Sequence, residues 1–350
     1  MLHESQLREL AQLPDITRED LSFKELTTLH LGGRPQAVLR CSTPTAVIQA
    51  ISVLDAHQIP LLVVGGGSNL VVADGEVPVV VVLIDAAQLE ISDTGLVRAA
   101  AGAVWDDVVA ATVERGLGGI ECLSGIPGSA GATPVQNVGA YGTEVAAVLT
   151  QVRLWDRHNQ TDSWVPASAL ELGYRYSNLK FTQRAVVLEI ELQLSPGGLS
   201  IPLRFADNQQ VPVAQAREMV LELRRSKGMV VDPADYDTWS AGSFFTNPVV
   251  SPAHAVALKE KHPTLPTYPA PDGVKLSAAW LIENAGFPKG YPHPSAPVGL
   301  STKHTLALTN RGVGTTAELV ELARELRAGV HASFQVTLEP EPVWVGVDIN

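Results

Sequence analysis

Apolar residues recur at helical spacing in several stretches of the chain. Behind a starting proline, Val47, Ile48, Ile51 and Leu54 form one apolar stripe, which predicts an amphipathic helix over residues 44–57. Similar patterns predict the other helices, at residues 105–113, 214–227, 253–261, 276–285 and 317–328. Short apolar runs rich in β-branched residues predict strands at residues 59–64, 79–83, 151–156 and 185–194.

The composition of the sequence changes after Gly228, where proline, tryptophan and tyrosine become frequent. We therefore predict a second module from about residue 229 to 334. Aromatic residues make up only 5% of the chain while Val, Ala and Leu abound, which favours an α/β or α+β enzyme over a lectin-like sandwich. A chain of 350 residues, 45% of them hydrophobic, can hold two or three compact domains.

Charge and cysteine content narrow the range of functions. The formal net charge of −12 argues against a general nucleic-acid or anionic-membrane binder, so anionic ligands need local devices such as glycine loops and single basic residues. Cys41 and Cys122 lie among small or apolar neighbours and are interpreted as buried free thiols, with a disulfide as the alternative. The histidines lack metal-ligand spacing, so no catalytic metal is expected.

The sequence also bears on where the protein works. The first residues show no basic-then-apolar signal pattern, and the longest apolar run, residues 77–84, contains a proline and is too short to span a bilayer. We therefore expect a cytoplasmic protein that binds neither membrane nor nucleic acid.

Two glycine-rich loops carry the strongest chemical signal. Residues 65–69 read Gly-Gly-Gly-Ser-Asn and follow a predicted strand, and residues 125–132 read Gly-Ile-Pro-Gly-Ser-Ala-Gly-Ala. Such loops let backbone N–H groups converge on a phosphate. Neither loop ends in the Gly-Lys-Ser/Thr of a P-loop, and the first lacks the third glycine of a Rossmann fingerprint. One glycine cluster alone is more often a turn, but two indicate a long phosphate-bearing cofactor touched at two places.

The second loop continues into a polar segment that strengthens this interpretation. Gln136 and Asn137, set among small residues and near Tyr141, suit hydrogen bonding to a flat heterocycle. The whole run, Gly-Ile-Pro-Gly-x-x-Gly-Ala-x-Pro-x-Gln-Asn-x-Gly-Ala-Tyr-Gly, together with the first loop, resembles the UDP-N-acetylenolpyruvoylglucosamine reductase family of bacterial cell-wall synthesis. The resemblance covers about residues 27–346. The first loop alone would indicate only the wider group of FAD domains shared with vanillyl-alcohol-type oxidases.

The resemblance implies an α+β fold with a two-part FAD-binding region and a smaller α+β substrate-binding domain. The first FAD-binding part would be residues 1–88 joined by a C-terminal strand at 335–350, the second part residues 89–228, and the substrate domain residues 229–334. The resemblance implies that the last strand, residues 335–346, returns to the first part. The implied ligands are noncovalent FAD, NADPH as co-substrate and a UDP-sugar substrate. A monomer is expected.

FAD contacts are implied in both glycine loops and in the segment that follows the second. The residues are Gly65, Gly66, Gly67, Ser68, Asn69, Gly125, Ile126, Pro127, Gly128, Gly131, Ala132, Gln136, Asn137, Gly139, Ala140 and Tyr141.

The implied reaction is reduction of an enolpyruvyl ether: NADPH reduces the flavin, which passes hydride to the vinyl group. The chemistry then needs a proton donor, a cation for the carboxylate and a group that balances the developing charge. The matching residues are Ser243 in Gly-Ser-Phe-Phe-Thr-Asn-Pro, Arg175 in Tyr-Arg-Tyr-Ser and Glu341 in Leu-Glu-Pro-Glu. Outside these motifs a Gly-Ser pair is usually a turn or cap and an arginine between tyrosines a surface cation–π pair. Glu339 is interpreted as an exposed surface residue.

Contacts to the substrate are implied for Tyr174, Lys227, Asn247 and Tyr268. A lysine near a helix end can instead simply neutralise that terminus, which is the alternative for Lys227.

The chain departs from the family pattern at a few positions. His304 stands where the family commonly has Gln, and Pro342 follows Glu341 where it usually has Val. Phe205 replaces a Tyr of many relatives.

Two other functions are compatible with such a flavin fold. One is an alcohol or sugar-acid oxidase, which would use O₂ and need no donor such as Ser243. The other is a flavin-binding regulatory module without catalysis, but cofactor binding alone would not require Arg175, Ser243 and Glu341 together.

Overall fold

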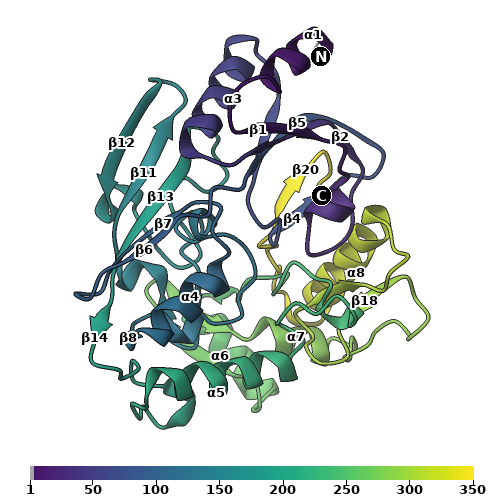
Figure 1. Ribbon diagram of the computed structural model, residues 1–350. Helices are drawn as coiled ribbons and strands as arrows, with labels where there is room; N and C mark the ends of the chain where they lie inside the picture. The colour runs from purple at the N-terminus through teal and green to yellow at the C-terminus, as the bar shows by residue number, and fades with distance from the viewer. Residues whose placement is uncertain (1–3) are drawn as a thin grey trace. The chain divides into compact units, whose positions relative to one another are not determined.

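The computed structural model describes residues 4–350, which form two compact units. Unit 1 comprises the segment up to Ser22, Pro35–Gly67 and Glu76–Arg225, and unit 2 comprises Phe23–Arg34, Ser68–Gly75 and Ser226–Asn350. Helices and strands are mixed in both units, as expected for an α+β fold (Figure 1). The predicted three-part division stays a prediction, since its boundary at residue 88 lies within unit 1.

The first sheet of unit 1 holds the start of the first glycine loop. Its strand order is β1-β2-β5-β3, with β3 and β5 parallel. Thr43 caps the helix that precedes β3 by accepting the Ala46 N–H at 3.2 Å, and Pro44 occupies its first turn, where a missing N–H costs nothing. The elements are β1 (Ile16–Glu19), β2 (Arg34–Cys41), α3 (Pro44–Ala56), β3 (Leu61–Val64) and β5 (Glu76–Ile84), with α1 (Glu4–Leu10) at the start of the chain.

A five-stranded antiparallel sheet forms the other layer of unit 1. Its order is β12-β11-β13-β7-β6, visible in Figure 1. The strands are β6 (Leu89–Ile91), β7 (Leu96–Ala100), β11 (Leu149–Asp156), β12 (Thr161–Pro166) and β13 (Ala185–Gln193). In sequence, helix α4 (Trp105–Glu114) lies between β7 and β11, and helix α5 (Val213–Ser226) follows β13. Short strand pairs are β8 (Leu117–Gly118) with β14 (Ser195–Pro196), and β9 (Gly139–Ala140) with β10 (Thr143–Glu144).

Unit 2 packs its helices around one apolar core that includes the buried rings of Phe244 and Phe245. Its last strand pairs in parallel with the strand that follows the first glycine loop. The strands are β4 (Leu70–Val72), β15 (Val249–Val250), β16 (Thr267–Ala270), β17 (Gly273–Leu276), β18 (Val298–Leu300), β19 (Leu308–Asn310) and β20 (Val343–Val345). The helices are α2 (Phe23–Leu26), α6 (Pro252–Lys261), α7 (Ala278–Asn284) and α8 (Thr316–Phe334).

The end of the chain differs from its prediction. Instead of a strand over residues 335–346, α8 continues to Phe334 and the strand is only Val343–Val345. The expected helix stopped before Gly329, but this glycine is a packing residue: a Cβ there would lie 2.4 Å from the Phe287 ring. The helix continues because Val330 and Phe334, one turn apart, are both buried in the core.

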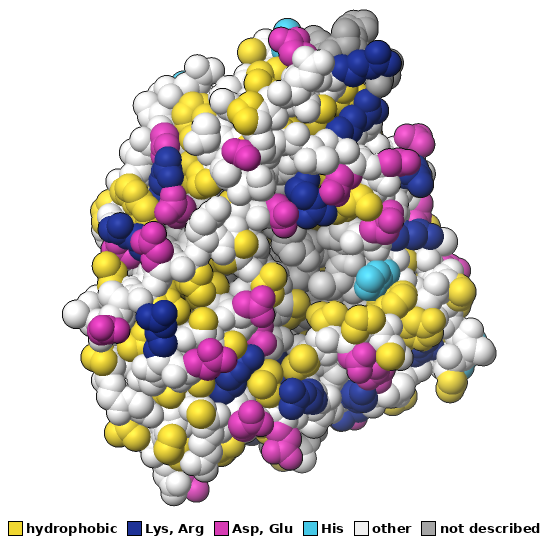
Figure 2. Space-filling view, in the orientation of Figure 1, with side chains coloured by type: hydrophobic (Ala, Val, Ile, Leu, Met, Phe, Trp, Pro, Cys, Tyr) yellow, Lys and Arg dark blue, Asp and Glu magenta, His cyan; other side chains and the backbone are white. Residues whose placement is uncertain are grey.

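In the part of the chain that the structure describes, the cysteines, the helices and the charged side chains bear on disulfides, membrane spans and metal sites. Cys41 and Cys122 are free and buried, which confirms their interpretation, and burial raises the pKa of each thiol to about 12. Within residues 4–350, no helix combines the length and apolarity needed to cross a membrane. The same residues contain no group of three or more His, Cys, Asp or Glu able to hold a metal ion. Acidic and basic side chains are interspersed over the face shown in Figure 2.

Candidate functional site

The two glycine loops meet backbone to backbone within unit 1. A Cβ on Gly66 would lie 2.6 Å from the Gly128 Cα, and one on Gly65 would lie 2.1 Å from the Ser129 Oγ. Gly67 (φ 58°) and Gly128 (φ 122°) adopt conformations that favour glycine. The loops therefore lie against each other, as a ligand touched by both requires.

The second loop is anchored on the turn between β7 and α4. The Ala130 and Gly131 N–H groups donate to the Ala103 and Ala101 carbonyls at 2.8 and 2.9 Å. A Cβ on Gly131 would lie 2.4 Å from the Ala101 Cβ. Gly131 is thus required for close packing under the loop, whereas Gly66 is exposed at its surface.

Asn137 holds the segment after the second loop in place. Its backbone adopts a left-handed conformation (φ 45°) and its side chain is 1% exposed. Its amide donates to the Glu144 carboxylate and the Gly173 carbonyl, both at 2.9 Å, and accepts the Ala146 N–H at 3.0 Å. The sequence analysis predicted a cofactor contact for Asn137; the structure adds this internal role.

Arg175 reaches from a distant turn to the same segment. Its Nη2 donates to the Gly139 carbonyl at 2.6 Å, and a Cβ on Gly139 would lie 3.1 Å from its Nη1. Its guanidinium also lies 5.3 Å from the ring centre of Tyr174, which is 48% exposed. The structure thus joins two predicted site regions that lie 36 residues apart.

In unit 2, Ser243 and Glu341 occupy two paired segments. The Glu341 N–H donates to the Phe244 carbonyl at 2.9 Å, and Phe245 forms an antiparallel bridge with Pro340. Both predicted catalytic side chains are half-buried, between the extremes of core and surface. The structure therefore brings together two segments whose predicted site residues are 98 positions apart in the sequence.

The end of the first glycine loop lies on this arrangement. Asn69 Nδ2 donates to the Glu341 carbonyl at 3.5 Å, and the Val343 N–H donates to the Asn69 carbonyl at 2.9 Å. Glu339 differs from Glu341: its side chain is 67% exposed, 3.6 Å from Arg327, as expected for a surface residue.

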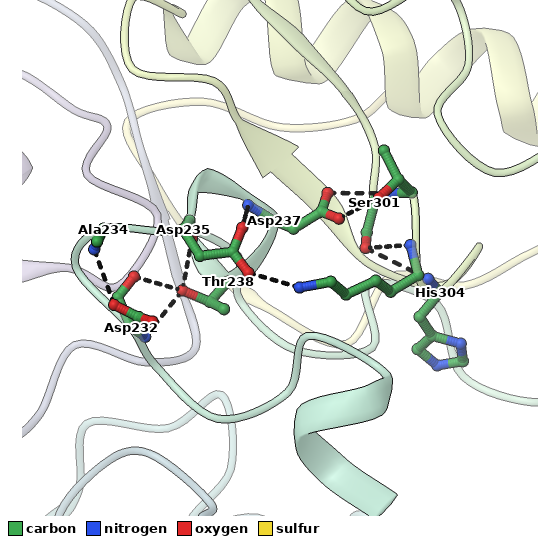
Figure 3. Close-up of polar contacts among 9 residues, drawn as sticks. Asp232, Ala234, Asp235, Asp237, Thr238, Ser301 and His304 are labelled. Atoms are coloured by element: carbon green, nitrogen blue, oxygen red, sulfur yellow. Dashed lines mark hydrogen bonds and ion pairs between the residues drawn. The ribbon is translucent and has the colours of Figure 1, made fainter.

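Lys227 and His304 also share one electrostatic environment in unit 2. Burial, together with the nearby charges of Lys227 and Lys289, lowers the pKa of His304 to about 4. The backbone of His304 is fixed by Ser301, whose Oγ accepts its N–H at 3.3 Å, beside a network in which Lys303 donates to Asp235 at 2.5 Å. The imidazole points away from that network (Figure 3).

Comparison with known proteins gives this site a family. A model of the UDP-N-acetylenolpyruvoylglucosamine reductase C-terminal domain matches residues 232–345, and an FAD binding domain model matches residues 35–160. A UDP-N-acetylenolpyruvoylglucosamine reductase of Corynebacterium glutamicum (strain R) is 58% identical over 100% of both chains. The chain belongs to the UDP-N-acetylenolpyruvoylglucosamine reductase family. It is an FAD-dependent oxidoreductase.

Further relatives agree. A reductase of the same family from Mycobacterium leprae (strain TN) is 51% identical, covering 94% of this chain and 95% of its own. A crystal structure of the Thermus caldophilus reductase has a TM-score of 0.67 at 23% identity, covering 94% of this chain and 99% of that one. The latter shows a shared fold, a two-part FAD-binding region with a C-terminal domain.

The loops of this reductase fit FAD on their own geometry. Glycine stands where any side chain on residue 66 would occupy the opposing backbone, so both main chains can approach a diphosphate closely. The segment after the second loop contains the polar Gln136 and the aromatic Tyr141, side chains of the kinds that line sites for flat heterocycles.

The predicted substrate contacts lie in different settings. Asn247 Oδ1 accepts the Ala278 N–H at 2.9 Å, at the start of α7, so this oxygen helps to cap a helix. Tyr268, on β16 opposite Lys275, is 49% exposed. Lys227 directly follows α5, which ends at Ser226, one residue before the end of the predicted helix.

Sequence reasoning missed two residues at the second loop. Asp106 accepts the Gly125 N–H at 2.6 Å, and Arg217 pairs with Asp106. The only sequence signal was an acidic residue in the first turn of a predicted helix, which usually just complements the helix dipole.

Proposed function

We propose that this reductase uses NADPH to convert the enolpyruvyl ether of UDP-N-acetylglucosamine enolpyruvate into UDP-N-acetylmuramate, a step of peptidoglycan precursor synthesis. The observation that carries the proposal is the closure of the Ser243 and Glu341 segments on each other, next to the end of the first glycine loop. An oxidase would need no such donor. Full-length identity of 58% to a relative named for this substrate supports the same conclusion.

FAD, when bound, supplies hydride transfer between the reduced nicotinamide and the substrate. Net reduction adds one hydride to the terminal vinyl carbon and one proton to the carbon that bears the carboxylate. We assign the proton to the Ser243 hydroxyl, whose alkoxide recovers it from solvent. A serine hydroxyl is a weak acid toward water, but a carbanion-like centre is a far stronger base.

Arg175 is assigned to the substrate carboxylate. Its planar guanidinium stays charged and can grip a carboxylate with two parallel hydrogen bonds. The bond from Nη2 to the Gly139 carbonyl fixes one side of the group beside the segment that follows the second glycine loop. Glu341 is assigned to charge balance at the developing enolate.

The substrate and cofactor sites follow from the same assignment. Both glycine loops and residues 136–141 would hold noncovalent FAD, and Tyr174, Lys227, Asn247 and Tyr268 would contact the UDP-sugar. We propose FAD-binding parts at residues 1–88 with 335–350 and at 89–228, and a substrate domain at 229–334. Matches of family models to residues 35–160 and 232–345 support this division. A cytoplasmic monomer is proposed, and light scattering tests its mass.

Product analysis tests the proposal. The purified holoenzyme is incubated without O₂ with the enolpyruvyl substrate and either NADPH or NADH. We expect a product heavier by two hydrogens, formed mole for mole with NADPH consumed. Formation of H₂O₂ in air, with no reduced sugar nucleotide, would support the oxidase instead.

A further inference from the structure

An ion pair anchors the first residue of the second glycine loop to α5. Arg217 donates from Nη1 and Nη2 to the two Asp106 oxygens at 2.6 and 2.8 Å, and the Gly125 N–H donates to Asp106 Oδ1 at 2.6 Å. The two side chains are 17% and 32% exposed, respectively. One carboxylate thus connects the helix and the loop, within unit 1.

The loop needs this anchor because its first residue has an uncommon conformation. Gly125 has a φ of 70°, and its N–H points to a side chain rather than to a secondary-structure partner. A backbone N–H bound by a carboxylate is held by a charge-assisted hydrogen bond, stronger than a neutral one. Asp106 therefore fixes where the loop begins.

A carboxylate beside a phosphate-binding loop carries an electrostatic cost, which Arg217 offsets. Burial raises the pKa of Asp106, but the bonds from Arg217 and Gly125 lower it more, so the group is ionised at neutral pH. Seven residues further along α5, on the same face, the partly buried Arg224 adds positive charge that acts on both Asp106 and Tyr141. The helix thus presents a cationic face to the loop.

We propose that Asp106 and Arg217 are positioning residues for FAD: Asp106 holds Gly125 in its binding geometry, and Arg217 cancels the charge that would otherwise repel the diphosphate. The proposal rests on the assignment of the second loop to FAD. It assigns α5 a part in cofactor binding that no motif in its sequence marks.

The chain contains a matched control. Arg157 donates to the two Asp55 oxygens at 3.0 and 2.6 Å, with side-chain exposures of 16% and 22%. This pair is also held by two hydrogen bonds and is similarly buried in the same unit, but its arginine also donates to the Gln183 carbonyl, at 2.9 Å, rather than its aspartate accepting from a glycine loop. A purely structural role predicts equal effects for the two pairs.

The test measures the dissociation constant of FAD from each purified variant by the recovery of flavin fluorescence on dilution. We expect Asp106→Ala to weaken FAD binding by about 10–100-fold. Asp106→Asn, which keeps an oxygen for Gly125, should weaken it by no more than about 5-fold. Asp55→Ala should leave it within about 3-fold of the parent protein.

A second variant keeps the test decisive where Asp106→Ala does not fold. Arg217→Gln leaves the carboxylate uncompensated, so FAD affinity should fall most at low ionic strength and recover as salt screens the repulsion. Arg157→Gln should show no such salt dependence. Equal effects at the two pairs, or a salt-independent loss in Arg217→Gln, would overturn the proposal.

The assignment of the loop itself has a separate readout. If Gly66→Val expels FAD while Asp106→Ala and Arg217→Gln bind it normally, the loop assignment stands and the positioning role is wrong. If Gly66→Val also binds FAD normally, the loop assignment is wrong and the positioning role falls with it.

Discussion

Gly66 and Gly128, one in each glycine loop, are so close that a Cβ on Gly66 would lie 2.6 Å from the Gly128 Cα. Two stretches of main chain therefore lie directly against each other, without side chains between them. Such an arrangement suits an extended diphosphate, whose oxygens take hydrogen bonds from backbone N–H groups.

Gly66→Val should expel FAD, because the new side chain meets backbone that cannot move without opening the second loop. The flavin content of the purified variant, read from its visible absorption, is the measurement. Gly95→Ala is the control: its Cβ would lie 2.2 Å from the Leu194 carbonyl oxygen, a comparable clash in a turn between β6 and β7. Equal loss of flavin in both variants would mean that general destabilisation, and not the loop contact, expels it.

FAD is expected to be bound noncovalently. Acid precipitation of the parent protein should therefore release all of the yellow flavin into the supernatant, and colour that stays in the pellet would contradict noncovalent binding.

Arg175→Lys should lower kcat by about 10–100-fold while raising KM much less, because the charge gained by the substrate carboxylate grows toward the transition state. A lysine ammonium keeps the charge but cannot bind both Gly139 and a carboxylate in the plane of a guanidinium. Steady-state kinetics give the two constants. Arg184→Lys, at an exposed arginine nearby, is the control and should be silent. A pure KM effect at Arg175 would contradict the assignment.

Glu341→Gln should lower kcat by about 10–100-fold, because the amide cannot balance charge as a carboxyl group does. Glu339→Gln, two residues earlier, changes an exposed side chain near Arg327 and should stay within about 2-fold of the parent rate. Because both variants replace a glutamate by a glutamine, any difference in their kcat must come from the position of the residue. Equal decreases in kcat in the two variants would contradict the assignment of Glu341 to charge balance.

His304 should make stability depend on pH. Its pKa is 6.5 when the side chain is exposed, as in the unfolded chain, and about 4 in the folded chain. Burial is the largest cause of this decrease, and the charges of Lys227 and Lys289 act in the same direction. Between these values the unfolded chain binds a proton that the folded chain does not, so the free energy of unfolding falls as the pH drops from 6.5 toward 4. His304→Gln should flatten this slope in urea titrations, whereas the exposed His158→Gln should keep it. An unchanged slope in His304→Gln would show that other groups cause the dependence.

Local patterns predicted the elements well, because amphipathic spacing and caps act over a few residues. Two examples are helix α3, which begins after its cap Thr43, and the parallel strand β3, which ends where the first glycine loop begins. Gly329 was misleading because a glycine that ends a helix and one that admits a neighbouring ring look alike in sequence. Phe287, which explains it, lies 42 residues away.

In the candidate site, too, the sequence predicted which residues matter but not which of them contact one another. Motifs marked the loops, Arg175, Ser243 and Glu341 without showing which would be adjacent. The Gly66–Gly128 approach and the Glu341–Phe244 hydrogen bond depend on how distant segments fold together. The Asp106–Arg217 pair carries no motif at all, since either residue alone is an ordinary helix-surface charge.

The central claim is that electrons pass from NADPH through bound FAD to the enolpyruvyl group, with Ser243 as the proton donor. Anaerobic stopped-flow absorption separates the two halves of this reaction. NADPH should bleach the flavin in the parent protein, in Ser243→Ala and in the exposed control Ser333→Ala.

Addition of the enolpyruvyl substrate should then restore the flavin colour in the parent and in Ser333→Ala. In Ser243→Ala this step should be slower by about 10²–10⁴-fold, because the positioned donor is missing. Recovery of colour at the parent rate in Ser243→Ala would contradict the donor assignment, and recovery in the parent only on admitting O₂ would contradict the reductase itself.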